Sequence, residues 1–308
     1  MPSLATAVPI DEVVTRASCV LCDQEIDPDW DHRCETCQGW RCRECGQCIH
    51  TEGRVRQWDT RVQAYSYRPR RYRPRGSYRA APLMGVELEV GGDQHRIADV
   101  VADVDAGADH LYLKRDMSID GVEIVTHPMT LTWARRFPFP EMLRRLERGC
   151  FVDGGDKEYG LHVHVARNAF RRDGKQSAAH QMLWLLFMYR NSAELEKLAR
   201  RKSDRWARFG QPMPGELARK AKVVECNDRY VAVNCNNKKT YELRFFKSTL
   251  NVQEFYAALE FADASVRYTR DVNVRDVLHG KAITWPHFAA WVAQRKYPNL
   301  LAEMNRSV

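Results

Sequence analysis

The segment Gly85-Val86-Glu87-Leu88-Glu89-Val90 decides the fold prediction, because polar and apolar residues alternate in it with a period of two. This alternation is typical of a strand with one face against a core. Glu87 and Glu89 then share a face, with Cα atoms about 6.5–7 Å apart. Two carboxylates this close repel each other unless a cation or a shared proton relieves them. The segment therefore predicts either a cation site or, more simply, a solvated strand face.

Two later segments repeat the alternation with other polar side chains. Gly160-Leu161-His162-Val163-His164-Val165 places two imidazoles on one face, opposite three apolar residues. Thr240-Tyr241-Glu242-Leu243-Arg244-Phe245 does the same with a carboxylate and a guanidinium, and an arginine fork matches a phosphate bidentately. One such strand is weak evidence, but three in order predict a sheet floor that holds cations and phosphates.

The rest of this region predicts helices and further paired strands. Asp120-Gly121 suits a tight turn, so residues 111–125 are predicted to form a hairpin with Asp116 and Glu123 flanking the turn. A second hairpin is predicted from 229–235 and 241–246. Helices are predicted at 97–106, 131–147 with interruptions at Pro138 and Pro140, 177–201, 252–268, and from about Thr284 onwards. Strands interspersed with helices indicate an α+β fold with a largely antiparallel sheet.

Composition and length set the outer limits of the interpretation. At 308 residues the chain suits one large domain and one small one. The net charge of +8 and the pI near 9.0 indicate tolerance for polyanions, and the charge is uneven along the chain. No apolar stretch is long enough to cross a bilayer, and residues 1–14 have neither the basic leader nor the apolar core of a secretory signal. We expect a cytoplasmic protein.

Residues 1–57 form a cysteine-rich head in which three C-x2-C knuckles predict zinc. Two closed sites need eight ligands. The predicted ligands are Cys19, Cys22, Cys34, Cys37, Cys42, Cys45, Cys48 and His50, with His32 as the alternative eighth. Disulfides are disfavoured because the number of cysteines in the cluster is odd and because the sequence shows no secretory signal. We expect a zinc-ribbon or treble-clef-like domain that recognises a partner and in which two structural zinc ions supply folding energy.

Residues 58–82 are rich in arginine, tyrosine and proline. Between residues 60 and 86 there is no acid, and seven arginines alternate with four tyrosines: Arg61, Arg68, Arg70, Arg71, Arg73, Arg75 and Arg79 with Tyr65, Tyr67, Tyr72 and Tyr78. Pro69 and Pro74 favour a solvated linker. Arginine interleaved with aromatics is also the chemistry of phosphate contact and base stacking, so a nucleic-acid or acidic-protein partner is the alternative.

Residues 83–308 resemble the amidoligase family, a largely phage and bacterial branch of the glutamine synthetase and glutamate–cysteine ligase superfamily. The matching motifs follow one another in order: Gly85-Val86-Glu87-Leu88-Glu89, Asp116-Met117-Ser118 leading to Gly121-Val122-Glu123, Gly160-Leu161-His162-Val163-His164, Arg229-Tyr230 leading to Asn234, Glu242-Leu243-Arg244-Phe245-Phe246, and Ser248-Thr249-Leu250. Each motif is short, and the order and separation of the set carry the resemblance. The head and the arginine-rich segment lie outside it.

The resemblance implies an ATP- and magnesium-dependent ligase that joins a carboxylate to an amine on a curled, antiparallel, glutamine synthetase-like sheet. The implied magnesium ligands are Glu87, Glu89, Glu123, His162 and Glu242. Arg244 and Arg229 would neutralise the transferred γ-phosphoryl group, His164 would orient substrate or a metal-bound water, and Asp116 would bind the amine or a metal. Substrates would be small molecules, peptides or proteins, in the host cytoplasm if the protein is phage-encoded.

Two other functions remain open at the level of sequence. One is a zinc-headed nucleic-acid-binding protein whose large domain is a non-catalytic scaffold. The other is a metal-dependent nuclease or phosphodiesterase that uses the same carboxylates and histidines in a two-metal site. The sequence has no Gly-x4-Gly-Lys-Ser/Thr loop and no Gly-x-Ser-x-Gly elbow, which disfavours a P-loop ATPase and a serine hydrolase.

Overall fold

The computed structural model describes residues 26, 32–33, 40–41, 58–76, 81–116, 118–153, 158–172, 174–210, 217, 220–221 and 230–306. The chain divides into two compact units, Met1–Gln57 and Trp58–Val308. In the first unit, strands β1 (His32–Arg33) and β2 (Trp40–Arg41) pair antiparallel. The seven cysteines and His50 predicted to bind zinc lie outside the described residues, as does Arg229.

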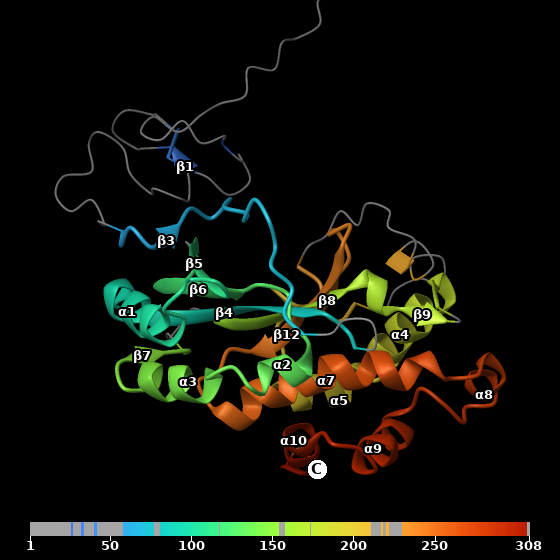
Figure 1. The fold of residues 1–308 in the computed structure, drawn as a ribbon. Helices are drawn as coiled ribbons and strands as arrows, with labels where there is room; N and C mark the ends of the chain where they lie inside the picture. The colour runs from blue at the N-terminus through green and yellow to red at the C-terminus, as the bar shows by residue number, and fades with distance from the viewer. Residues whose placement is uncertain are drawn as a thin grey trace, which may run out of the picture. The chain divides into compact units, whose positions relative to one another are not determined.

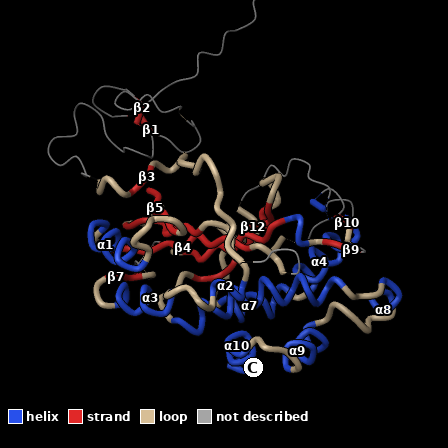
Figure 2. The backbone as a smooth tube through the Cα atoms, viewed as in Figure 1, coloured by secondary structure: helices blue, strands red, loops and turns tan. Residues whose placement is uncertain are grey.

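A mostly antiparallel sheet organises the second unit (Figures 1 and 2). Its strands lie in the order β11-β12-β8-β4-β6-β5-β3, and β7 pairs with the far end of β4. Their bounds are β3 (Val62–Gln63), β4 (Met84–Gly92), β5 (Leu111–Asp116), β6 (Gly121–Thr126), β7 (Cys150–Phe151), β8 (Gly160–Ala166), β11 (Val233–Asn234) and β12 (Thr240–Lys247). A separate ribbon joins β9 (Arg171–Arg172) and β10 (Lys175–Gln176).

Helices cover one face of this sheet, with α7 running along it in Figure 1. The helices are α1 (Gln94–Val104), α2 (Leu131–Ala134), α3 (Phe139–Glu147), α4 (Ala178–Arg190), α5 (Ser192–Ala199), α7 (Val252–Arg270), α8 (Val274–Leu278), α9 (Trp285–Ala293) and α10 (Pro298–Arg306), with a 3-10 turn at Arg167–Ala169. None of the described helices is long and apolar enough to cross a membrane.

The core lies between the sheet and these helices. Val86, Leu88 and Val90 of β4 are almost fully buried, and Leu161 and Val163 of β8 join them in the same apolar cluster. Because side chains alternate along a strand, the polar residues of these strands are directed to the opposite face. The alternation that predicted the strands therefore separates an apolar face from a polar one, and the polar face carries the candidate site.

The segment predicted as a solvated linker is partly built into the sheet. Within residues 58–76, β3 pairs parallel with β5, and Arg75 forms a parallel bridge with Met129. Asp59 anchors the start of the segment, because its backbone N–H donates to the Gln94 side chain at 3.2 Å and its carboxylate lies 2.9 Å from His95. These pairings are with residues distant in sequence, so local composition alone did not predict them.

The predicted helix at 177–201 is two helices, α4 and α5, which meet at Asn191. The buried Asn191 amide donates to the carbonyl oxygens of Phe187, at 2.7 Å, and Ile283, at 3.0 Å. The helix predicted at 131–147 also divides, as its two prolines suggest, into α2 and α3.

Candidate functional site

The polar face of the sheet gathers charged side chains from five neighbouring strands. Strand pairing sets residues of adjacent strands opposite one another: Glu87 faces His162, Glu89 faces Glu123, and Glu242 faces His164. Opposed residues on one face of an antiparallel pair have Cβ atoms only about 4.5–5.5 Å apart. The register of the sheet, which no single strand could reveal, therefore brings the candidate residues into one cluster.

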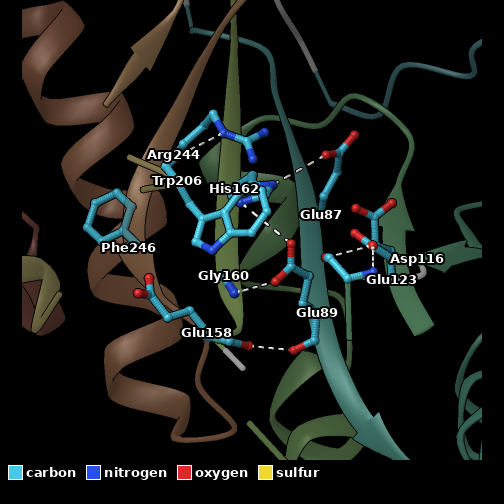
Figure 3. Close-up of polar contacts among 12 residues, drawn as sticks. Glu87, Glu89, Asp116, Glu123, Glu158, Gly160, His162, Trp206, Arg244 and Phe246 are labelled. Atoms are coloured by element: carbon cyan, nitrogen blue, oxygen red, sulfur yellow. Dashed lines mark hydrogen bonds and ion pairs between the residues drawn. The ribbon is translucent and has the colours of Figure 1, made fainter. Parts of the chain in front are cut away.

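Glu87 contacts both histidines of this cluster, and Figure 3 shows it beside His162. One of its carboxylate oxygens is 3.6 Å from His162 Nδ1, and the other is 3.3 Å from His164 Nε2. His162 also lies 3.7 Å from Glu89 through Nε2 and 3.6 Å from Glu242 through Nδ1. One imidazole thus stands among three carboxylates, an arrangement that a cation would stabilise.

Strand β12 adds a carboxylate held by two neighbours. Glu242 forms an ion pair with Arg244, and its other carboxylate oxygen accepts a hydrogen bond of 2.8 Å from the side chain of Asn234. The Nε of Arg244 donates to the carbonyl oxygen of Trp206 at 3.4 Å. These contacts fix the orientation of the guanidinium beside the cluster, as a phosphate-binding group requires.

At the other end of the cluster, Glu89 is held by the start of β8. The backbone N–H of Gly160 donates to its carboxylate at 2.6 Å, and the Ser248 hydroxyl donates to its backbone carbonyl at 2.6 Å. A Cβ added at Gly160 would lie 2.6 Å from His162 Nε2 and 2.9 Å from a nitrogen of Arg201. A side chain therefore does not fit at this position without displacing His162 or Arg201.

Three overlapping groups on this face have the composition of metal sites. Each has ligand atoms within 4.8 Å of one another: Glu87, His164 and Glu242; Glu87, Glu123 and His162; and Glu89, Asp116 and Glu123. Carboxylate oxygens are the ligands that magnesium prefers, whereas imidazole is more typical of transition-metal sites. Nδ1 of His162 and Nε2 of His164 are buried and make no hydrogen bond to a described residue. Buried polar atoms normally have partners, so the donor set fits bound cations.

The ionisation of these carboxylates follows their surroundings. Burial alone would raise the pKa of Glu87, but the charges of His164 and His162 outweigh it and hold that pKa well below the usual range. The pKa of Glu123 is raised well above its usual value by burial and by the charge of Glu87. Burial likewise raises the pKa of Glu89. Glu89, Glu123 and Glu242 are buried, so they do not form the solvated strand face that the alternation alone allowed, and strongly shifted acids are typical of functional sites.

The described residues are not equally open to solvent. The side chains of Glu87, His164 and Arg244 are 23%, 18% and 17% exposed, whereas His162 and Glu123 are almost fully buried. A ligand would therefore approach past Glu87, His164 and Arg244, with the remaining carboxylates beneath.

The structure brings together eight of the nine predicted residues of this site. Asp116 lies at its edge, where its carboxylate accepts hydrogen bonds from the N–H and hydroxyl of Ser118, both at 2.7 Å. Arg229 alone lies outside the described residues. Lys114 was missed, although it is two residues from Asp116 on the same strand face and its ammonium lies 3.4 Å from Glu123. The period-two pattern could have found it.

Arg201 was also missed, and no local signal marks it. Its guanidinium donates to the carbonyl oxygens of Arg244 and Phe246 at 3.3 and 3.5 Å and lies 3.1 Å from the Glu158 carboxylate. It therefore ties the end of α5 to β12 beside the cluster.

A hollow of about 430 Å³ lies away from this cluster. It is lined by residues of α2, α7 and the segment from α9 to the start of α10, including Arg135, Asp263, Arg267, Trp291 and Tyr297. None of the candidate metal ligands lines this hollow, so the candidate site is identified from the side-chain cluster and not from a cavity.

Comparisons with known proteins gave matches among solved structures only. No family model matches the sequence, and no curated protein matches it. Among solved structures, the chain is similar to the crystal structure of the complex between the prokaryotic ubiquitin-like protein Pup and its ligase PafA, at 11% sequence identity and a TM-score of 0.36. The match covers 74% of this chain and 64% of that one, so the chain spans less than two thirds of its length.

Proposed function

We propose that the large unit is an ATP- and magnesium-dependent ligase that joins a carboxylate to an amine. The observation that carries the proposal is the convergence of four glutamates, two histidines and Arg244 on one sheet face, in the order of the amidoligase motifs. A bound triphosphate is stabilised by several cations and a guanidinium at close range. This face offers ligands for cations, and Arg244 supplies a guanidinium.

In this proposal the chain's residues mainly position the substrates and neutralise the negative charge of the phosphate groups. Glu87, Glu89, Glu123, His162 and Glu242 would hold magnesium ions, which supply positive charge to the phosphate oxygens of ATP. Arg244, oriented by Glu242 and Trp206, would contact the γ-phosphoryl group. Arg229 would also neutralise the γ-phosphoryl group, and His164 would orient the substrate or a metal-bound water.

The reaction would proceed in two balanced steps. A carboxylate oxygen attacks the γ-phosphorus of ATP, the bond to the β-phosphate oxygen breaks, and ADP and an acyl phosphate result. An amine nitrogen then attacks the acyl carbon, phosphate leaves, and the amine proton passes to a base, for which Asp116 at the edge of the cluster is our candidate. The amide formed carries one carboxylate oxygen fewer, and that oxygen leaves with the phosphate.

The proposal is tested with the full chain, ATP, Mg²⁺ and panels of amines and carboxylates, with mass spectrometry for condensation products. ¹⁸O in the carboxylate should appear in the released phosphate, and ADP rather than AMP should accumulate. Glu87→Ala should abolish Mg²⁺-dependent ATP consumption and keep the circular dichroism spectrum. Glu141→Ala on the exposed face of α3 is the matched control. ATP consumption that survives Glu87→Ala would remove Glu87 from the site.

A metal-dependent phosphodiesterase or nuclease is the second candidate. It is favoured by the overlap of the three ligand groups, because Glu87 belongs to the first two groups and Glu123 to the last two. Two adjacent cations are what two-metal hydrolysis uses. Mg²⁺-dependent cleavage of nucleic acid without ATP, lost in Glu87→Ala, would select this function. The two-zinc head also remains a prediction from cysteine spacing.

A further inference from the structure

An anchored strip of arginines and tyrosines, residues 65–75, borders the polar face of the sheet. Its backbone is fixed at both ends: β3 pairs with β5 just before it, and at its end the Arg75 N–H donates to the Pro128 carbonyl at 2.8 Å. The Thr130 N–H then donates to the Arg75 carbonyl at 3.1 Å. Pro69 and Pro74 restrict the backbone between these points. The strip is therefore held in place.

Three tyrosines of the strip are exposed although each contacts an ordered neighbour. Tyr65, Tyr67 and Tyr72 are 42%, 37% and 44% exposed, and they are half of the large exposed apolar side chains in the described part of the chain. Tyr67 meets the ring of Tyr112 at 5.6 Å, and Tyr72 meets His127 at 6.0 Å, both nearly edge to face. Exposed aromatic rings gathered within eight residues give this segment apolar surface that a partner could cover.

The arginines between these tyrosines are uncommitted. Arg68, Arg70 and Arg71 are exposed and make no ion pair with a described carboxylate, whereas Arg73 pairs with Asp109. An exposed arginine without an acidic partner contributes little to stability, but it can bind an anion without first breaking an ion pair. The strip thus offers several free positive charges at intervals of one or two residues.

We propose that residues 65–75 bind single-stranded nucleic acid, a function separate from the ligase reaction. The free arginines would contact phosphates and the exposed tyrosines would stack on bases, the combination typical of sequence-tolerant single-strand binding. An acidic polypeptide would use the arginines alone and leave the tyrosine rings without a role. A duplex keeps its bases stacked inside and would likewise leave the tyrosines unused.

The test measures binding of the full chain to a fluorescent oligothymidine of about 20 nucleotides by anisotropy over a range of salt. Replacing three phosphate contacts, with Arg68→Gln, Arg70→Gln and Arg71→Gln combined, should make the slope of log affinity against log salt shallower by about 2. Tyr67→Ala and Tyr72→Ala should each weaken binding about fivefold or more. Tyr65 is left intact because its ring lies under Lys114, beside the candidate site.

The matched control removes three exposed cations elsewhere: Arg144→Gln, Arg275→Gln and Lys281→Gln combined. It changes the net charge equally and should reduce affinity much less than the strip variant. Equal losses in the two triple variants, no binding of oligothymidine, or tighter binding of polyglutamate or duplex DNA would overturn the proposal. Strip variants should keep Mg²⁺-dependent ATP consumption, so failure of this proposal and failure of the ligase proposal are distinguishable.

Discussion

Glu123→Gln should stabilise the protein without Mg²⁺ and reduce its stabilisation by Mg²⁺. Glu123 is 4% exposed and belongs to two of the three candidate ligand groups, with Glu87 in one and with Glu89 and Asp116 in the other. Replacing the carboxylate with an amide of the same shape removes a negative charge from among these acids. A residue kept for its packing alone would not respond in opposite directions to this change.

The magnitude follows from the distances. At an effective dielectric constant of about 20, like charges at the 4.8 Å limit of these groups repel by about 3 kcal/mol a pair. The attraction between Glu123 and the Lys114 ammonium at 3.4 Å offsets about 5 kcal/mol of the summed repulsion from the neighbouring acids. The raised pKa of Glu123, caused by burial and by Glu87, lets a proton relieve part of the remainder. We therefore expect a gain of about 1–3 kcal/mol, or about 2–4 °C in Tm for each kcal/mol.

The assay is thermal unfolding at neutral pH, first without added metal and then across a Mg²⁺ titration. Chelators are avoided because they would also remove zinc from the predicted head. The wild-type Tm should rise with Mg²⁺, since a ligand of the folded state stabilises it. Glu141→Gln, at an exposed carboxylate, should change neither the Tm without Mg²⁺ nor the rise in Tm that Mg²⁺ causes. A Glu123→Gln variant that is less stable without Mg²⁺, or that keeps the full Mg²⁺ response, would refute the metal-site interpretation.

Two further changes test the surroundings of the site and the core. Gly160→Ala places a methyl group 2.6 Å from His162 Nε2, so it should destabilise the fold by about 1–3 kcal/mol in urea unfolding, and an effect below about 0.5 kcal/mol would contradict the close approach. Burial lowers the pKa of His110 from 6.5 to about 4. The unfolded chain therefore takes up this proton at a higher pH than the folded chain does, so stability should fall by up to about 3 kcal/mol as the pH drops from 6.5 to 4. In His110→Phe that part of the pH dependence should disappear from unfolding curves, and an unchanged profile would assign it to other groups.

The sequence predicted those parts of the fold whose signals are local. Alternation in β4, β8 and β12 fixed both the strands and the face on which their charged residues lie, and the Asp120-Gly121 turn identified the β5–β6 hairpin. The pairing order of the strands was beyond such signals. It places β4 between β8 and β6, and this order is what turns separate pairs of residues into one cluster.

What the sequence missed depends on partners far along the chain. The break between α4 and α5 relies on the Asn191 amide reaching Ile283, and carbonyl groups of β12 hold Arg201 beside the site. Helices α8 and α10 were not predicted. Lys114 is a different case, since the alternation that places it beside Glu123 is present in the sequence, but an ammonium group is not a metal ligand.

The two-residue strand β3 also decides where the chain can be cut. It occupies the hydrogen-bonding edge of β5, and at the opposite end of the sheet β11 is equally short. Such short edge strands disfavour edge-to-edge pairing between the sheets of different molecules. A truncated chain that starts at Trp58 keeps β3. A chain that starts just before β4 lacks it, so the backbone edge of β5 is exposed and can pair with another molecule. Separating the cysteine head from the large unit therefore calls for a cut before the arginine-rich strip.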